Sequence, residues 1–201
     1  MFDTFAVQIG QEIYLQHAER PVTAVYDMAC GHGLLGILLA YRFAEMKVIC
    51  VDTTKRPCFD QYVGAFRKLG APAANEATCS LSNVTFIEDD IRNVQVGKRG
   101  GDGDGGDGGV PFLVGIHGCN EATKVLVEMA HSLGCGFAMM PCCIRNDLYS
   151  VRTFSHHGSI GNDDQRYALM VGVVAGQCGA HRISAIDRLI TNRNLILYGK
   201  G

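Results

Sequence analysis

The sequence predicts an α/β fold built on a seven-stranded, mostly parallel sheet. Apolar runs of strand length alternate with segments of helical periodicity, the pattern of a parallel sheet covered on both faces. Three successive apolar runs also end in carboxylates, at Asp27, at Asp52 and at Glu88-Asp89-Asp90. Because the carboxyl ends of parallel strands meet at one edge of a sheet, we expect these acids to line a ligand-binding edge.

The first half of the chain supplies three strand–helix pairs in order. After a first helix at 4–18, an apolar run at 23–29 ends in an acid, a glycine turn and an apolar helix. The next apolar runs end in the same way, and a helical segment follows the second of them. We expect strands at 23–29, 47–52 and 83–88, and helices at 33–44 and 58–69.

The second half continues the alternation and then changes it. We expect strands at 112–117 and 137–140, with a helix at 120–133 between them and another at 163–177. Two strands, 182–187 and 194–198, follow without a helix between them. The sheet should therefore close with an antiparallel member.

Length and composition favour one intracellular domain. A chain of 201 residues with 47% hydrophobic residues suits a single domain, 1–201, with a full core. Its net charge of −2 creates no global attraction for nucleic acid, but residues 145–201 carry 7 basic and 4 acidic side chains and would meet an anionic substrate more favourably. An odd number of cysteines, nine, indicates reduced thiols in a cytoplasmic compartment, with an organelle left open. No signal peptide or membrane span is visible, so we expect no membrane partner.

The tract from Gly97 to Gly109 interrupts the alternation. It contains eight glycines and three aspartates and carries too little apolar surface to pack, so we predict a disordered insertion. Its Gly-Asp pattern superficially resembles a calcium-binding nonapeptide repeat. That repeat needs several copies with an apolar residue in each, and here there is one tract.

The glycine turn after the first strand is compatible with two nucleotide ligands. Gly31, Gly33 and Gly36 satisfy the spacing of the dinucleotide fingerprint, with Asp52 as a ribose ligand, which leaves a nicotinamide oxidoreductase open. However, Asp27 stands just before the turn, where a carboxylate repels a pyrophosphate and attracts an ammonium or sulfonium group. These acids favour S-adenosylmethionine, which carries positive charge and no phosphate.

The same residues resemble the class I S-adenosylmethionine-dependent methyltransferases. Asp27-Met28-Ala29-Cys30-Gly31-His32-Gly33 resembles that family's acidic glycine motif, with Ala29 in place of its first glycine, a change that is tolerated if the position needs no positive φ. The resemblance implies a Rossmann-like three-layer sandwich that binds S-adenosyl-L-methionine. The cofactor-binding residues it implies are Asp27, Ala29, Cys30, Gly31, Gly33, Asp52 for the ribose, Asp89 and Asp90 for the adenine amino group, Ile91 through its backbone N–H, and His117.

Two later segments resemble a subgroup, the tRNA ribose 2′-O-methyltransferases and related methyltransferase-like proteins. They are Ile116 to Thr123 and Met140-Pro141-Cys142-Cys143, which follow the fourth and fifth expected strands. The sequence departs from the subgroup at Asn120 and Lys124. The resemblance implies tRNA or another RNA as acceptor, and places Cys119, Cys142 and Cys143 on the substrate side. Arg145, shortly after the fifth expected strand, is a further substrate-side candidate that could shape the acceptor pocket or bind phosphate.

His117 is the candidate catalytic residue, because a neutral imidazole can accept a proton from a hydroxyl acceptor near pH 7. Several alternatives stay open. Each acid could cap a helix N-terminus, and His117 could be structural. The cysteines lack the paired spacing of a zinc site, so we expect no metal. The departures at Asn120 and Lys124 leave open a non-catalytic cofactor-binding protein. The oligomeric state is not indicated.

Overall fold

We describe the chain from a computed structural model. The structure describes residues 2–69, 81–97, 109–118, 121–145, 147–149 and 162–201. Residues 98–108 of the predicted insertion, Cys119 and Asn120 therefore lie outside the described residues. Within the described part, no helix is both long and apolar enough to cross a membrane.

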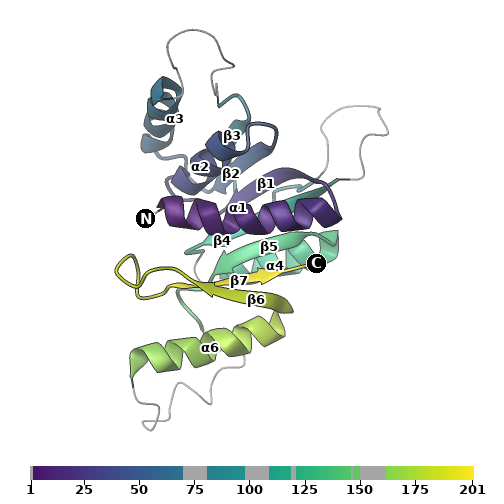
Figure 1. Ribbon diagram of the computed structural model, residues 1–201, viewed down its shortest axis with the longest axis vertical. Coiled ribbons are helices and arrows are strands. Elements are labelled where there is room, and N and C mark those ends of the chain that lie inside the picture. The colour runs from purple at the N-terminus through teal and green to yellow at the C-terminus, as the bar shows by residue number, and fades with distance from the viewer. Residues whose placement is uncertain (1, 70–80, 98–108, 119–120, 146, 150–161) are drawn as a thin grey trace. The chain divides into compact units, whose positions relative to one another are not determined.

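The predicted seven-stranded, mixed sheet is confirmed, with the strand order β3-β2-β1-β4-β5-β7-β6 (Figure 1). The strands are β1 Val22–Met28, β2 Lys47–Asp52, β3 Val84–Glu88, β4 Val110–Ile116, β5 Gly136–Met140, β6 Ala180–Ala185 and β7 Leu195–Gly199. The helices are α1 Phe2–Glu19, α2 Leu34–Arg42, α3 Cys58–Leu69, α4 Glu121–Leu133 and α6 Asp163–Gln177.

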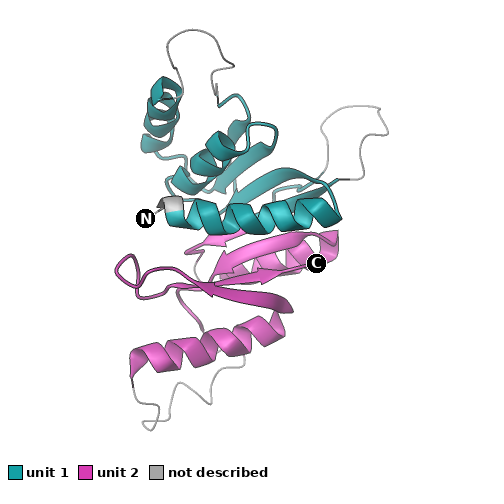
Figure 2. Cartoon of the chain, in the orientation of Figure 1, with its two compact units in different colours: residues 1–113 teal, residues 114–201 magenta. Residues whose placement is uncertain are grey.

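The chain divides into two compact units, residues 1–113 and 114–201 (Figure 2). In unit 1, β1, β2 and β3 pair in parallel, with Asp27 opposite Cys50 and Asp52 opposite Glu88. This register brings the three expected carboxyl ends to one edge. In unit 2, β7 pairs antiparallel with both β5 and β6, which confirms the antiparallel closing member.

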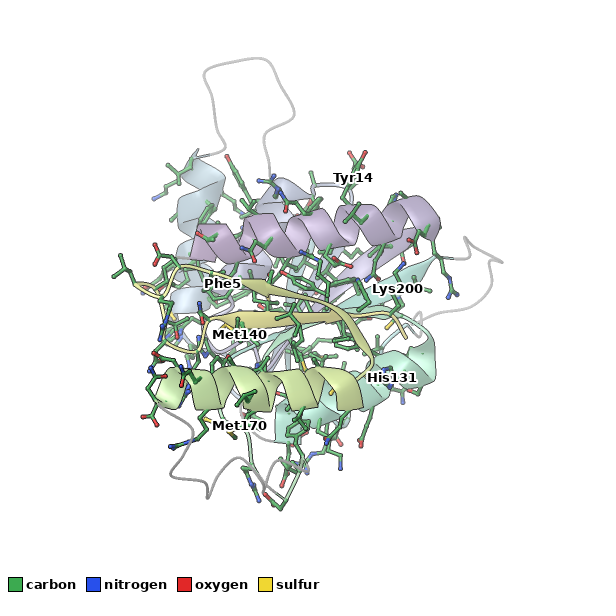
Figure 3. The ribbon with its side chains drawn as sticks, turned by 60° about the horizontal axis from the view of Figure 1, so that its bottom comes forward. Phe5, Tyr14, His131, Met140, Met170 and Lys200 are labelled. Atoms are coloured by element: carbon green, nitrogen blue, oxygen red, sulfur yellow. The ribbon has the colours of Figure 1, made fainter. Side chains whose placement is uncertain are left out.

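Helix α1 packs against the rest of unit 1 through one apolar face. Phe5, Ile9 and Ile13 are at most 1% exposed and recur every four residues, the spacing of one helix face. Tyr14, on the other side of α1, is 70% exposed; Figure 3 labels it and the buried Phe5. The helix packs closely on α2 because Gly10 leaves room: a Cβ there would lie 3.0 Å from the ring of Phe43.

Asn83 holds the end of α2 and the turn that follows it. Its side-chain Nδ2 donates to the carbonyl oxygens of Ala40, Phe43 and Met46 at 2.9–3.0 Å. Its own carbonyl accepts from the backbone N–H of Val48 at 2.8 Å. One residue before β3 therefore satisfies carbonyls that the end of a helix leaves without intrahelical donors.

Unit 2 is held by the buried strands β5 and β7. All five residues of β5 are buried, as are Ile196, Leu197 and Tyr198 of β7. Helix α4 packs on β5, and α6 packs on β6 and β7. His131 of α4, labelled in Figure 3, joins the two helices: its Nε2 lies 3.1 Å from the carbonyl oxygen of Cys178, which follows α6.

Candidate functional site

The glycine turn between β1 and α2 has left-handed backbone at alternating positions. Ala29, Gly31 and Gly33 have φ of 54°, 58° and 71°. The condition under which alanine is tolerated at position 29, a backbone without positive φ, is therefore not met: Ala29 adopts the conformation that glycine adopts without strain. A non-glycine residue in this region is strained, so the surrounding contacts must hold it there.

Asp52, at the end of β2, fixes the glycine turn. Its Oδ2 accepts a hydrogen bond of 2.8 Å from the backbone N–H of Gly31. The neighbouring N–H of Cys30 donates to the carbonyl of Val51 at 3.0 Å. Asp52 therefore does not cap a helix. It ties the turn to β2 and is half-buried at the edge where a ligand can reach it.

Asp27 lies beneath the turn and caps α2 from a distance. The side chain is 3% exposed, and its Oδ2 accepts from the backbone N–H of Gly36 at 3.0 Å. Gly33, the residue at the N-cap position, offers no side chain for this role. Burial raises the pKa of Asp27 to about 7, the Gly36 hydrogen bond lowers it, and the charge of Asp52 raises it.

The glycines differ in what surrounds them. A Cβ on Gly33 would lie 2.5 Å from the ring of Phe59, and one on Gly36 would lie 2.3 Å from Sγ of Cys50. These two glycines permit the start of α2 to pack against β2 and α3. A Cβ on Gly31 would meet no atom within 4 Å. The surface at Gly31 is therefore open, and it is the part of the turn that a ligand can approach.

Four amide donors in and after the turn are used within the chain. The backbone N–H groups that donate to protein oxygens are those of Cys30, Gly31, Gly33 and Gly36. A pyrophosphate needs such N–H groups as donors, and here the carboxyl groups of Asp27 and Asp52 accept from two of them. This arrangement disfavours the dinucleotide interpretation. It fits a ligand with positive charge and a ribose.

The acids after β3 form a compact turn. Asp90 Oδ1 accepts from the backbone N–H and the Nε of Arg92, both at 2.9 Å, and Asp89 Oδ1 accepts from Asn93 Nδ2 at 2.9 Å. The side-chain and backbone hydrogen bonds from Arg92 lower the pKa of Asp90 to about 2. Asp90 is thus a carboxylate at neutral pH. The side chain of Ile91 is buried beside it.

The backbone link between Asp89 and Asp52 joins the two acidic ends. The N–H of Asp89 donates to the carbonyl of Asp52 at 3.0 Å. Unit 1 therefore brings together the predicted cofactor-binding residues other than His117: the acids at the ends of β1 and β2, the turn after β1, and the Asp89–Ile91 turn.

Unit 2 contains His117 and the predicted acceptor-side residues Cys142, Cys143 and Arg145, whereas Cys119 lies outside the described residues. His117 follows β4 with a φ of 58°, and partial burial lowers the pKa of its imidazole. Thr123 Oγ1 donates to the carbonyl of Gly118, which anchors the start of α4 next to this residue. His117 is therefore held in a constrained backbone and favours the neutral imidazole.

The Cys142-Cys143 turn follows β5. The two Sγ atoms are 3.7 Å apart, with Cys142 half-buried and Cys143 exposed. Tyr167 of α6 donates its hydroxyl to the carbonyl of Pro141 at 3.2 Å and so holds the start of this turn. Arg145 is exposed and forms a bidentate ion pair with Asp147, which raises its pKa.

A sequence model described as a methyltransferase domain matches residues 4–149. The chain belongs to this methyltransferase family. The match includes every predicted site residue, from Asp27 to Arg145. Among curated proteins, none matches the sequence significantly.

Solved methyltransferase structures have similar folds. The 16S rRNA methyltransferase KamB has 14% identity and a TM-score of 0.52 over 93% of this chain and 91% of that one. Human methyltransferase 10 domain containing protein has 8% identity and a TM-score of 0.50, covering 100% and 82%. The bifunctional kinase-methyltransferase WbdD has 11% identity and a TM-score of 0.55; the alignment covers 100% of this chain and 40% of WbdD. These similarities show the class I methyltransferase fold.

Three residues that pack against or close the turns of the candidate site were missed by sequence reasoning. Cys50 contacts α2 only because β1 and β2 pair in a register that the sequence does not display. Phe59, in α3, packs against Gly33. Arg92 could have been expected, because an arginine two residues after an aspartate can close a turn on it.

Proposed function

We propose that unit 1 binds S-adenosyl-L-methionine around Gly31, between the acidic ends of β1, β2 and β3. The observation that carries this proposal is the turn itself: the amides of Gly31 and Gly36 are bound by the carboxyl groups of Asp52 and Asp27, and the turn after β3 adds the ionised carboxylate of Asp90. In this proposal Asp52 binds the ribose hydroxyls while it holds Gly31. Asp90, or Asp89 beside it, accepts from the adenine amino group, and Ile91 offers its backbone N–H to the ring.

Asp27 has a different role in this proposal. The carboxylate is buried beneath the turn, so it acts on the cofactor through its charge and through α2. A cation above the turn favours the ionised form of a carboxyl group whose pKa is about 7. Ala29, Cys30 and Gly33 contribute the backbone shape that leaves Gly31 accessible.

We further propose that the acceptor is a ribose hydroxyl of an RNA of tRNA size. The segments Ile116 to Thr123 and Met140 to Cys143, which resemble tRNA ribose 2′-O-methyltransferases, support this proposal, as does the fold shared with the rRNA methyltransferase KamB. The basic excess of residues 145–201 suits a polyanion. Cys119, Cys142, Cys143 and Arg145 then belong to the acceptor side.

Bound S-adenosylmethionine supplies a methyl group on a sulfonium, which is already activated for transfer. The protein has to align the acceptor oxygen, exclude water and remove one proton. His117 suits the last task, since its lowered pKa leaves the imidazole neutral and able to accept the hydroxyl proton. Arg145 offers a guanidinium that can exchange Asp147 for a phosphate of the RNA backbone.

The test has a binding arm and a transfer arm. S-adenosylhomocysteine should raise the melting temperature, because it binds only the native state, and NAD should not. Asp52→Ala should weaken S-adenosylhomocysteine binding by at least about tenfold through lost charge-assisted hydrogen bonds. Asp60→Ala removes an exposed acid of α3 paired with Lys55 and is the matched control. Stabilisation by NAD alone, or unchanged affinity in Asp52→Ala, contradicts the cofactor site.

The transfer arm identifies the acceptor. Labelled S-adenosylmethionine is incubated with total tRNA, with rRNA fragments, with protein extract and with small metabolites. The proposal expects label in tRNA-sized RNA, and expects digestion of that RNA to yield 2′-O-methylated nucleosides. Label in the protein or metabolite fraction, or base methylation, overturns the ribose acceptor but leaves the cofactor site intact.

A further inference from the structure

Cys30 and Cys50 both form hydrogen bonds with Gly33 of the glycine turn. Cys30 is part of the turn, and its carbonyl accepts from the N–H of Gly33 at 2.9 Å. Cys50 is on β2, and its Sγ donates to the carbonyl of Gly33 at 3.9 Å. The backbone bond from Cys30 N to Val51 O, 3.0 Å long, places Cys30 alongside this part of β2. Unit 1 therefore holds both thiols at the same end of α2.

The two thiols differ in access. Cys50 is fully buried, whereas Cys30 is half-buried at the surface of the turn. The neighbouring Cys30 thiol raises the pKa of Cys50, and burial raises it further. Thiol reactivity follows exposure and thiolate character, so Cys30 is the residue that meets a solvent oxidant first, with Cys50 beside it as a second thiol.

We propose that Cys30 and Cys50 form a reversible disulfide that switches off cofactor binding at the glycine turn. This regulation rests on the proposed cofactor site, and it adds to that site a response to peroxide. The disulfide itself depends only on the placement of the two cysteines in unit 1.

The oxidant is hydrogen peroxide, and the steps balance. The Cys30 thiolate attacks one peroxide oxygen: an S–O bond forms, the O–O bond breaks, and the second oxygen leaves as water after taking a proton. The Cys50 sulfur then attacks the sulfenic sulfur of Cys30: the S–S bond forms, the S–O bond breaks, and a second water leaves with the Cys50 proton. Two thiols and one peroxide give one disulfide and two waters. A dithiol such as dithiothreitol reverses the change.

The disulfide would act on the turn because Cys30 lies between two left-handed residues, Ala29 and Gly31. An S–S bond of about 2.05 Å needs both sulfurs much closer than two thiols in contact, so Cys30 must move toward β2. That movement displaces the N–H of Gly31 from Asp52, the contact that holds the open face of the turn. Oxidation should therefore reduce cofactor affinity without unfolding the chain.

A second thiol pair has to be distinguished from this one. Cys142 and Cys143 are 3.7 Å apart and more exposed, so peroxide can reach them too. The double variant Cys142→Ser/Cys143→Ser removes that pair. Cys50→Ala removes the buried partner of Cys30 and leaves the residues assigned to cofactor binding in place.

The chain offers a clean chemical readout. Trypsin releases residues 1–42, which contain Cys30 as their only cysteine, and residues 48–55, which contain only Cys50. After brief peroxide treatment of the native protein and blocking of residual thiols, a peptide pair joined by a disulfide should be seen by mass spectrometry. In Cys50→Ala the pair must be absent, and dimedone should label Cys30 as a sulfenic acid. Bound S-adenosylhomocysteine should slow both reactions.

The affinity readout completes the test. S-adenosylhomocysteine affinity of the oxidised protein should fall by at least about tenfold and recover with dithiothreitol, both in wild type and in Cys142→Ser/Cys143→Ser. No linked peptide pair in wild type, or a linked pair without change in affinity, overturns the switch. A loss of affinity that depends on Cys142 and Cys143 overturns it as well. If the reduced protein does not bind S-adenosylhomocysteine, the proposed function fails, and the peptide pair still decides whether the disulfide forms.

Discussion

The buried carboxylate of Asp27 accepts a hydrogen bond from the backbone N–H of Gly36 at 3.0 Å, nine residues later in the chain. This contact joins the end of β1 to the first turn of α2. It replaces the side-chain cap that Gly33 cannot supply. Strand, turn and helix are therefore coupled through one titratable group beneath the proposed cofactor site.

We expect Asp27→Asn to remove a pH dependence of stability. The pKa of Asp27 is raised from 3.8 to about 7, so the native state binds a proton that the unfolded state has released between these values. Its contribution to stability is then lost as pH rises from about 4 to about 7, up to an upper bound of about 4 kcal/mol. Asparagine keeps an oxygen acceptor for Gly36 and has no charge. Urea unfolding at pH 5 and pH 8 should show the variant gaining relative to wild type at pH 8. An equal difference at both pH values would contradict a raised pKa.

Ala29→Gly should leave the protein as stable as wild type or up to about 1.5 kcal/mol more stable. Glycine removes a left-handed penalty of about 1–2 kcal/mol and adds a flexibility cost of about 0.5–1 kcal/mol. The control is Ala65→Gly, at an exposed site inside α3, which should cost about 1 kcal/mol. Urea unfolding of both variants checks this. Equal losses in the two variants would mean that position 29 is not left-handed.

Gly36→Ala should destabilise unit 1 by about 1–3 kcal/mol, because its Cβ would lie 2.3 Å from the sulfur of Cys50. Gly64→Ala, in α3 with no atom within 4 Å of its Cβ, should instead be neutral or stabilising by up to about 1 kcal/mol. The double variant Gly36→Ala/Cys50→Ala should recover most of the loss, and the coupling energy from the four proteins measures the contact. Strictly additive effects would contradict it.

His117→Asn should reduce turnover by more than about tenfold while S-adenosylhomocysteine affinity stays within a factor of about two. Asparagine is chosen because it tolerates a φ of 58° better than alanine and cannot act as the base. Single-turnover methyl transfer to tRNA-sized RNA and calorimetric titration supply the two numbers. His117→Gly tests the backbone alone. Full activity in both variants would make His117 structural and favour an acceptor that needs no base.

The fold could be predicted from the sequence because its elements have clear local patterns. The predicted bounds of β2 and α3, 47–52 and 58–69, match the structure, since one ends in an acid and the other has a strongly amphipathic face. β6 begins two residues before its predicted start. The ends of this strand depend on pairing with β7, which no local pattern records.

The site was predicted less completely than the fold. The acids were identified because three of them follow three strands, but the sequence does not reveal which partner each has. From the sequence, Asp27 and Asp90 could both have been helix caps. In the structure Asp27 caps α2, whereas Asp90 accepts from Arg92 and closes a turn. The left-handed Ala29 was missed because residue type argues against it. That the chain is a single domain stays a prediction.

The contacts of Asn83 make the end of α2 sensitive to a chemical change in one side chain. Its amide nitrogen is placed among three carbonyl oxygens at the end of α2. Hydrolysis of the side-chain amide during storage would leave an aspartate of almost the same shape, which at neutral pH has acceptors and no donors. The same three carbonyls would then face a negative charge. Loss of this one side-chain amide would therefore loosen the end of α2 and the turn before β2 together.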